Sequence, residues 1–169
     1  MSINIFFVLI LGLLLGMYGY FAPNYVPQQE KREIPKIQLM DFTLYEISNK
    51  GIDHILEGKE GKKFDERYTV TSGKFSDNTK SLFQSIRSDN VVYQYDILNL
   101  TGNVYYSRAD GLEFHSDEGT YDTNNSVIQT QGSFVITQNA NRIDGEKLNY
   151  HTGQKTVTAN QVRGSYQLK

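Results

Sequence analysis

Apolar residues from about position 37 onward alternate with polar ones instead of recurring every three or four positions. Leu112 and Phe114 form one such run, and Leu148 and Tyr150 form another. Turn-forming sequences such as "NKG", "ADG" and "HTG" separate the runs. A period of two over short segments is typical of strands that bury one face. The pattern predicts an antiparallel all-β domain over residues 37–169.

The second half of the chain repeats itself. The segment Leu100–Gln131 aligns with Thr130–Gln161, and Gly102, Gly132 and Gly164 begin successive units at intervals of 30 and 32 residues. Repeats of this length indicate supersecondary units that stack and bury their apolar faces against one another.

The N-terminal segment Ile3–Ala22 contains 20 residues without a charged side chain. As a helix it is long enough to cross the roughly 30 Å hydrocarbon core of a bilayer. A cleaved signal peptide is the alternative, but its apolar region is normally shorter, follows basic residues and ends at small ones. Here bulky aromatic residues occupy those positions, and Pro23 follows the last apolar residue. We therefore predict a retained membrane anchor over residues 1–23.

Two further features accompany the predicted anchor. Residues 24–36 are polar, contain two prolines and have no apolar period, which predicts a juxtamembrane linker. Gly12 and Gly16 form a G-x-x-x-G motif, which favours close packing against another membrane helix. Glycines are also common in such helices without a specific partner, so both interpretations stay open. Charge alone does not fix the orientation, because the first basic pair follows the segment.

Composition and motifs argue against several classes of function. The formal net charge of -2 and the scattered basic residues disfavour nucleic-acid binding. The chain has no cysteine, which excludes disulfides, thiolate metal sites and a cysteine nucleophile. His54, His115 and His151 lie far apart, and the acidic segment Asp110–Glu118 lacks the ligand spacing of a calcium loop. No phosphate-binding loop or nucleophile motif occurs. The sequence therefore predicts no catalytic residue, no metal and no cofactor.

The order of these features resembles the LptC family, the membrane-tethered periplasmic members of the lipopolysaccharide-export (Lpt) system within the LptA-like (OstA) superfamily. The resemblance rests on the apolar N-terminal segment, the Pro-containing linker, "DFTLYEISNKGI" at Asp41–Ile52, and the repeated units of roughly 30 residues. It implies a twisted antiparallel β-jelly roll, with two splayed sheets around an apolar groove, preceded by a single transmembrane helix. It also implies single-pass anchoring in the inner membrane, with the C-terminal domain in the periplasm.

The implied function is that of a non-enzymatic conduit. It would receive lipopolysaccharide from an inner-membrane ABC transporter and pass it to the periplasmic protein LptA. The inward-facing residues of the alternating runs would line the groove for acyl chains: Val91, Tyr93, Val104, Tyr106, Leu112, Phe114, Phe134, Ile136, Leu148 and Tyr150. On the pattern alone, the same residues also suit the filled core of a small β-sandwich.

The resemblance also implies protein partners at both ends of the domain. The first strands, with Phe42 and Leu44, would meet LptF of the LptF/LptG transporter, which the LptB ATPase drives. The last strand, with Val157, Ala159 and Val162, would add a strand of LptA by β-augmentation. The alternative is that charged residues merely protect a solvent-exposed edge.

Two other functions remain as hypotheses. One is an envelope scaffold that uses its sheet edges for assembly without binding lipid. The other is an enzyme built around the segment Asp110–Glu118.

Overall fold

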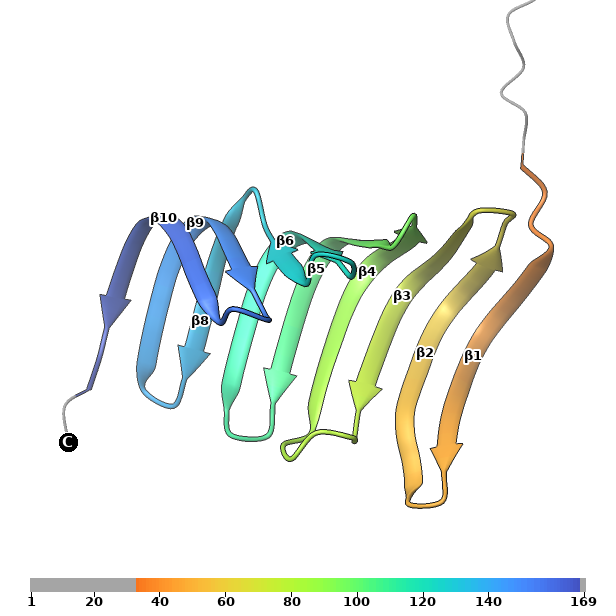
Figure 1. Cartoon of the computed structure of the whole chain (residues 1–169), viewed down its shortest axis with the longest axis horizontal. Helices are drawn as coiled ribbons and strands as arrows, with labels where there is room; N and C mark the ends of the chain where they lie inside the picture. The colour runs from red at the N-terminus through yellow and green to blue at the C-terminus, as the bar shows by residue number, and fades with distance from the viewer. Residues whose placement is uncertain (1–32, 168–169) are drawn as a thin grey trace, which may run out of the picture. The chain divides into compact units, whose positions relative to one another are not determined.

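The computed structural model describes residues 33–167 (Figure 1). The strands are β1 (Ile37–Ser48), β2 (Gly51–Lys63), β3 (Arg67–Asp77), β4 (Gln84–Gln94), β5 (Ile97–Arg108), β6 (Leu112–Asp122), β7 (Val127–Gln129), β8 (Ser133–Gln138), β9 (Asn141–His151) and β10 (Thr156–Ser165). The predicted anchor, most of the predicted linker and the pair Gly12 and Gly16 lie outside the described residues. Over residues 33–167, we find no helix with the length and apolar character that crossing a bilayer requires.

All ten strands belong to one antiparallel sheet. The strands follow chain order from β1 to β6; β7 and β8 both lie between β6 and β9, and β10 forms the far edge. The prediction of an antiparallel all-β fold is confirmed. The expectation of two separate sheets is corrected, because the hydrogen bonding of the described strands runs unbroken through one sheet.

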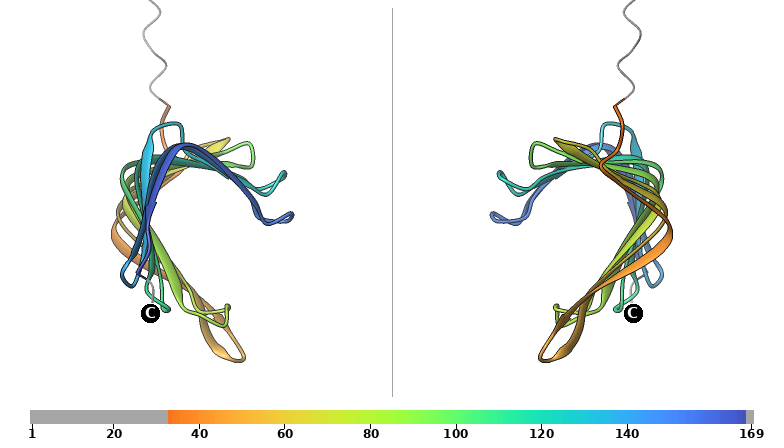
Figure 2. Two further views of the ribbon diagram at one scale, coloured as in Figure 1. Left: turned by 90° about the vertical axis from the view of Figure 1, so that its left-hand side faces the viewer. Right: turned by 90° about the vertical axis from the view of Figure 1, so that its right-hand side faces the viewer.

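A line of bends crosses this sheet and folds it over. Register shifts lie between Arg87 and Asn90 in β4 and between Thr101 and Val104 in β5. Several strands carry a residue with positive φ near the same line: Asp41, Ser72, Asn103, Lys147 and Gln161. Bulges and left-handed residues sharpen the bend of a strand. The result is a sheet with a C-shaped cross-section, open along one side (Figure 2).

The bends also explain the repeat in the sequence. The unit Leu100–Gln131 contains the antiparallel pair β5 and β6 together with β7. Gly102 lies on the bend line with a φ of +77°, and a Cβ there would come within 2.6 Å of the Asp89 carboxylate. Glycine is therefore the residue that suits this position. Each unit of about 30 residues therefore supplies two long antiparallel strands: one crosses the line of bends, and the next returns across it.

Candidate functional site: an apolar trough

The concave face of the bent sheet forms a trough with two walls. Directly opposed residues of paired strands share a face, so the register identifies the lining. On the first wall, the register joins one apolar row through eight strands: Leu44, Leu56, Phe75, Ile86, Tyr106, Phe114, Ile136 and Ile143. This row runs nearly the full length of the sheet, from β1 to β9.

The second wall carries two further rows on the same face. The row nearer the bend contains Leu39, Gly61, Val70, Val91, Leu100 and Gly119. The row nearer the rim is rich in tyrosine and contains Ile37, Lys63, Tyr68, Tyr93, Leu98, Tyr121, Ile128, Tyr150 and Val157. The Tyr68 and Tyr93 rings lie 6.3 Å apart, and Lys63 Nζ lies 5.3 Å from the centre of the Tyr68 ring.

Glycines at the bend allow the two walls to meet at the floor of the trough. A Cβ on Gly58 would lie 2.7 Å from Val70 and 2.8 Å from the Phe42 ring, so these two side chains pack against bare backbone. Gly73 is approached in the same way by Val70 and Val91. Small residues here let large side chains from both walls approach the backbone closely.

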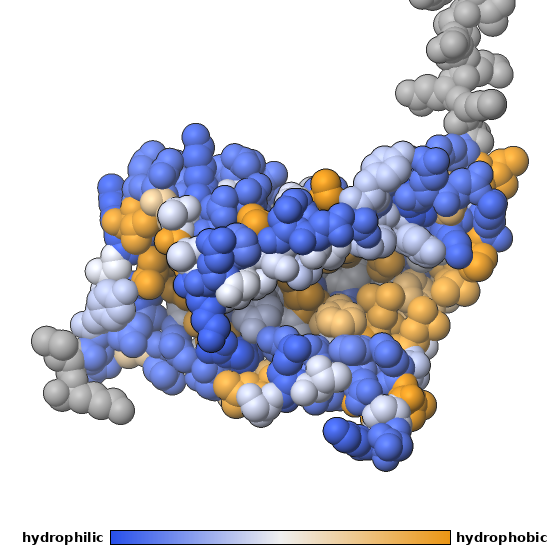
Figure 3. All heavy atoms as spheres, in the orientation of Figure 1, coloured by the Kyte–Doolittle hydropathy of each residue, from blue (hydrophilic) through white to orange (hydrophobic). Residues whose placement is uncertain are grey.

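Burial changes along the length of the trough. In the central strands Val104 is 1% exposed and Phe134 is 2% exposed, so the floor there is sealed. Toward β1–β3 the lining opens to solvent, with Leu44 49%, Tyr68 47% and Phe75 39% exposed. The space-filling view shows hydrophobic surface inside a hollow between two polar margins (Figure 3).

No second layer covers this apolar face within residues 33–167. Every strand–strand contact joins hydrogen-bonded neighbours. A sheet with an apolar face normally buries it against another sheet or a helix. Here the described part of the chain buries its apolar face only by bending, and a strip of hydrophobic surface is left in an open concavity.

The rim of the first wall is polar and internally hydrogen-bonded. The register aligns Glu46, His54, Asp77, Gln84 and Arg108 in one row, immediately above the apolar row. His54 Nδ1 lies 2.8 Å from Glu46 Oε2, and His54 Nε2 lies 3.4 Å from Asp77 Oδ1. Gln84 Nε2 donates to Asp77 Oδ2, and the Tyr106 hydroxyl donates to Gln84 Oε1. These bonds tie five strands together at the trough's margin, β1 to β5.

Asp77 is the most buried carboxylate of this row, at 7% exposure. Burial opposes its ionisation, but hydrogen bonds from the Thr79 hydroxyl and N–H, from Gln84, and the charge of His54 outweigh burial and hold its pKa below the usual value. Farther along the rim, the Arg108 guanidinium lowers the pKa of Asp110 through two hydrogen bonds of 2.8 and 2.9 Å. Asp110 is thus held in an ion pair with Arg108.

All ten residues predicted to line a groove lie on the trough face. Tyr106, Phe114 and Ile136 belong to the first wall, and Val91, Tyr93 and Tyr150 belong to the second. Val104 and Phe134 form the floor, and Leu112 and Leu148 share the face of Phe114 and Tyr150, two residues away on the same strands. Binding of a ligand by these residues remains a prediction.

Other lining residues were missed by the sequence-based selection. Leu56 and Phe75 are the clearest, and both lie in the open part of the trough. Their strands alternate weakly because polar and glycine residues interrupt the apolar period. The rim residues Glu46, Asp77 and Arg108 were also missed, since only the register brings them into one row.

The five residues predicted for the edge strands also have side chains on the trough face. β1 and β10 form the two edges of the sheet, and each pairs with one neighbour. Phe42 and Leu44 point into the trough from β1. On β10, Val157 is the partner of Tyr150, and Ala159 and Val162 share its face across the local irregularity. At each edge, backbone N–H and C=O groups are therefore available to a partner strand. The five side chains extend the apolar lining of the trough.

The histidines and the acidic segment form no metal site. Within the part of the chain that the structure describes, no group of three or more His, Asp or Glu side chains is placed to hold a metal ion. Glu118 accepts a hydrogen bond from the Gln131 N–H, and Glu113 accepts one from Thr137. Glu113 and Glu118 thus contribute to local structure.

Comparison with known proteins identifies the family. The LptC-related lipopolysaccharide-assembly family matches over residues 7–167. The chain belongs to this family. Membership indicates a role in lipopolysaccharide transport and a periplasmic domain, and proteins of this family act in transport rather than as enzymes. No curated protein sequence matches the chain significantly.

The fold is also found among solved structures. The chain is similar to LptH from Pseudomonas aeruginosa, described as the LptA-homologous periplasmic component of the conserved lipopolysaccharide transport device. The TM-score is 0.51 at 12% sequence identity, and the similarity covers 78% of this chain and 94% of LptH. At this identity the likeness concerns the fold: an LptA-like antiparallel β structure.

Proposed function

We propose that this LptC-related protein carries the acyl chains of lipopolysaccharide in its trough, as an inner-membrane-anchored segment of the export bridge. The observation that supports this most directly is the exposed apolar lining of β1–β3, which no other described element covers. A soluble domain rarely leaves a contiguous apolar concavity open without a ligand or partner for it.

The chemistry of the lining suits acyl chains. Exposing each CH₂ of a lipid to water costs about 0.8 kcal/mol, so a lipid with several chains needs a continuous apolar path. Leu, Ile, Val and Phe side chains provide burial without fixed hydrogen-bond geometry. The apolar row from Leu44 to Ile143 forms such a path across the strands.

The two sheet edges support a position between two partners. We infer that β1 pairs with LptF of the LptF/LptG complex and that β10 pairs with LptA, with energy supplied by the LptB ATPase. Both edges belong to the same sheet, so a partner strand at either end would continue the trough rather than interrupt it. The predicted membrane anchor would hold the domain beside the transporter.

The test is site-specific photo-crosslinking in cells that make lipopolysaccharide. A crosslinker at Phe75 or Phe114 faces the trough, whereas one at Glu113 faces the opposite side, beside its partner Ser107. The first two positions should capture lipopolysaccharide and the third should not. Equal capture at all three positions would refute the trough as the binding site.

A scaffold that binds no lipid is the second candidate, supported by the two open sheet edges. Under that hypothesis, a polar residue in the exposed trough lining would leave function intact in the folded protein. Loss of lipopolysaccharide export with Phe75→Gln, at unchanged protein level and unchanged partner association, would exclude the scaffold function.

A further inference from the structure

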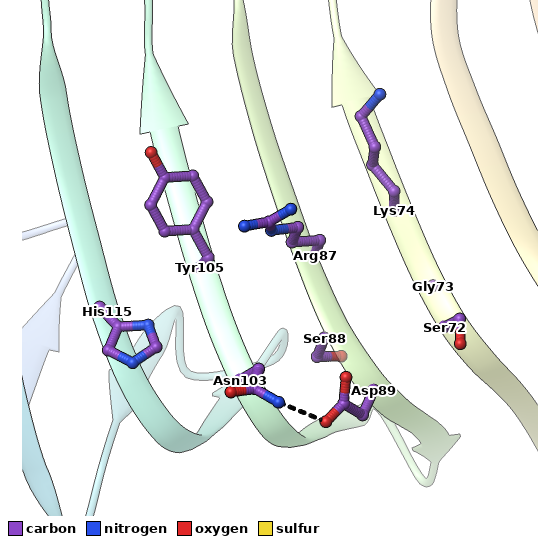
Figure 4. A pocket seen from close by; sticks show the side chains of 9 residues that line it. All are labelled: Ser72, Gly73, Lys74, Arg87, Ser88, Asp89, Asn103, Tyr105 and His115. Carbon is purple, nitrogen blue, oxygen red and sulfur yellow. Dashed lines mark hydrogen bonds between the residues drawn. The ribbon is translucent and has the colours of Figure 1, made fainter.

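A second concavity lies on the outer face of the sheet, behind the trough. It has a volume of about 390 Å³, and its lining includes Lys74 from β3, Arg87 from β4, Tyr105 from β5 and His115 from β6. These side chains project from neighbouring strands on one side of the sheet (Figure 4). They alternate with trough residues, since Lys74 precedes Phe75 and Tyr105 precedes Tyr106.

Two cations lie next to each other in one cross-strand row, and Glu57 pairs with Lys74 from the other side. Lys74 and Arg87 are direct cross-strand partners, and the register continues from Arg87 to Tyr105 and then to His115. Like charges directly opposite one another destabilise a sheet. Residues that are locally unfavourable for the fold occur preferentially at functional sites.

Within residues 33–167, Lys74 has a carboxylate partner, whereas Arg87 does not. Lys74 Nζ lies 2.9 Å from Glu57 Oε2. The Arg87 guanidinium lies 4.8 Å from the centre of the Tyr105 ring, and it forms no ion pair with any carboxylate of residues 33–167. A hydrogen bond to Glu113, together with burial, raises the pKa of Tyr105, so its ring stays uncharged beside the cation.

Two further carboxylates lie on this face: Asp89 in the lining of the concavity and Glu113 beside Tyr105. Asp89 Oδ2 accepts a hydrogen bond of 2.7 Å from the Asn103 amide. This bond uses part of the acceptor capacity of Asp89 and holds it at the bend. The Lys74 side chain extends along β3, whereas the Arg87 side chain reaches toward Tyr105 on β5 (Figure 4). The Ser72 hydroxyl adds a further polar group to the lining.

We propose that this outer concavity binds a phosphate group, either free or carried by a phosphorylated sugar. Arg87 offers five N–H donors in a planar fork and Lys74 offers a point charge, a combination that suits an oxyanion with three or more oxygens. The site is separate from the proposed lipid path because it occupies the opposite face of the same strands. A ligand there would leave the trough free.

The test is binding by the full-length protein in a neutral, phosphate-free detergent at low salt, followed by ³¹P NMR line broadening and calorimetry. The probes are inorganic phosphate, glucosamine 6-phosphate and, as the uncharged control, glucosamine with its amine acetylated. Lys74→Gln and Arg87→Gln remove one charge each. Arg87→Lys keeps the charge but removes the planar guanidinium group and its paired N–H donors. Lys80→Gln, in the exposed turn after β3, is the matched control. Circular dichroism checks that every variant is folded.

The expected result is binding of a phosphate probe that weakens about tenfold or more in Lys74→Gln and in Arg87→Gln, since each removes a charge-assisted hydrogen bond. Arg87→Lys should fall between Arg87→Gln and the parent, and Lys80→Gln should match the parent. Preference for the phosphorylated sugar over inorganic phosphate would identify a sugar-borne source, and the reverse would identify free phosphate. Absence of phosphate binding, or an equal loss in Lys80→Gln, would overturn the proposal.

Discussion

The ring of Phe134 lies against the α-carbon of Gly145, its direct partner in the adjacent strand. A Cβ added to Gly145 would come within 2.7 Å of the Phe134 ring and 3.2 Å of the Asn160 carbonyl oxygen. The most buried aromatic residue of the trough floor is therefore accommodated by the absence of a side chain next to it.

We expect Gly145→Ala to destabilise the fold by about 1–3 kcal/mol, because the Phe134 ring must move within a sealed floor. The measurement is urea unfolding of the full-length protein in detergent. Gly132→Ala is the matched control, since the nearest atom to its added Cβ is Glu118 Oε1 at 3.9 Å. That change is expected to alter stability by less than about 1 kcal/mol. Equal effects of the two substitutions would contradict the packing described for Phe134.

Neighbouring residues of β1 provide a test of the trough. Leu44 faces the trough and is 49% exposed, whereas Tyr45 faces outward and is 57% exposed. We expect Leu44→Gln to lower the amount of lipopolysaccharide that copurifies with the protein, and Tyr45→Gln to leave it unchanged. Mass spectrometry after gentle extraction gives the ratio of lipid to protein. Identical ratios in the two variants would argue against an acyl-binding lining at this end.

The buried carboxylate of Asp77 predicts a dependence of stability on acid. Its pKa is lower in the folded protein than the usual 3.8, so the folded state favours the ionised form. The stability that this ionisation contributes is fully present above pH 3.8 and is lost as the pH falls through the lower folded pKa. In the Asp77→Asn protein, the free energy of unfolding should therefore depend less on pH in this acidic range.

At neutral pH, Asp77→Asn should cost about 1–3 kcal/mol, because an amide group cannot accept all the hydrogen bonds from Thr79 and Gln84. Asp117→Asn serves as the control. Its side chain is exposed on β6 and has no hydrogen-bond partner among residues 33–167, so the change in stability should stay within about 0.5 kcal/mol. An Asp77→Asn protein as stable as the parent at every pH would disprove the role given to this carboxylate.

Proline substitutions in β10 test strand addition at the C-terminal edge. Successive backbone N–H groups of a strand point to opposite sides, so one of Val157 and Thr158 donates toward β9 and the other toward solvent. Proline has no N–H. One variant should lose at least about 1 kcal/mol of stability, and the other should stay folded but lose association with LptA. Retained association in both variants would show that LptA does not add to this edge.

The G-x-x-x-G motif of the N-terminal segment predicts helix packing in the membrane. Gly12→Leu or Gly16→Leu should reduce copurification with LptF and LptG, because a large side chain prevents close approach of two helices. Leu14→Phe, on the opposite face of the predicted helix, serves as the control. Unchanged copurification in all three variants would leave the motif without a packing role.

The fold was predictable where local alternation is strong. Leu112 and Phe114, and Leu148 and Tyr150, alternate with polar residues, and they lie on one face as expected. The repeat of about 30 residues matches two successive strands of the sheet, but the prediction that the units bury their apolar faces against one another was wrong, because the described strands join edge to edge in one sheet. The LptC resemblance was confirmed over residues 7–167.

The bend and the polar rim were not predictable in the same way. Asp41, Ser72 and Asn103 adopt positive φ, but their residue types occur at many ordinary positions in the chain. Glu46, His54 and Asp77 come from three strands and meet only through the register of the sheet. Nothing in their spacing along the chain marks them as neighbours.

The sequence by itself determined that this chain forms antiparallel strands with one apolar face, because side chains along a strand alternate between two faces. Only the tertiary structure decided that the strands form one sheet, that the sheet bends over its apolar side, and that the lining stays open at β1–β3. Alternation specifies which residues share a face, whereas the closure of that face depends on backbone bends and cross-strand register between distant segments.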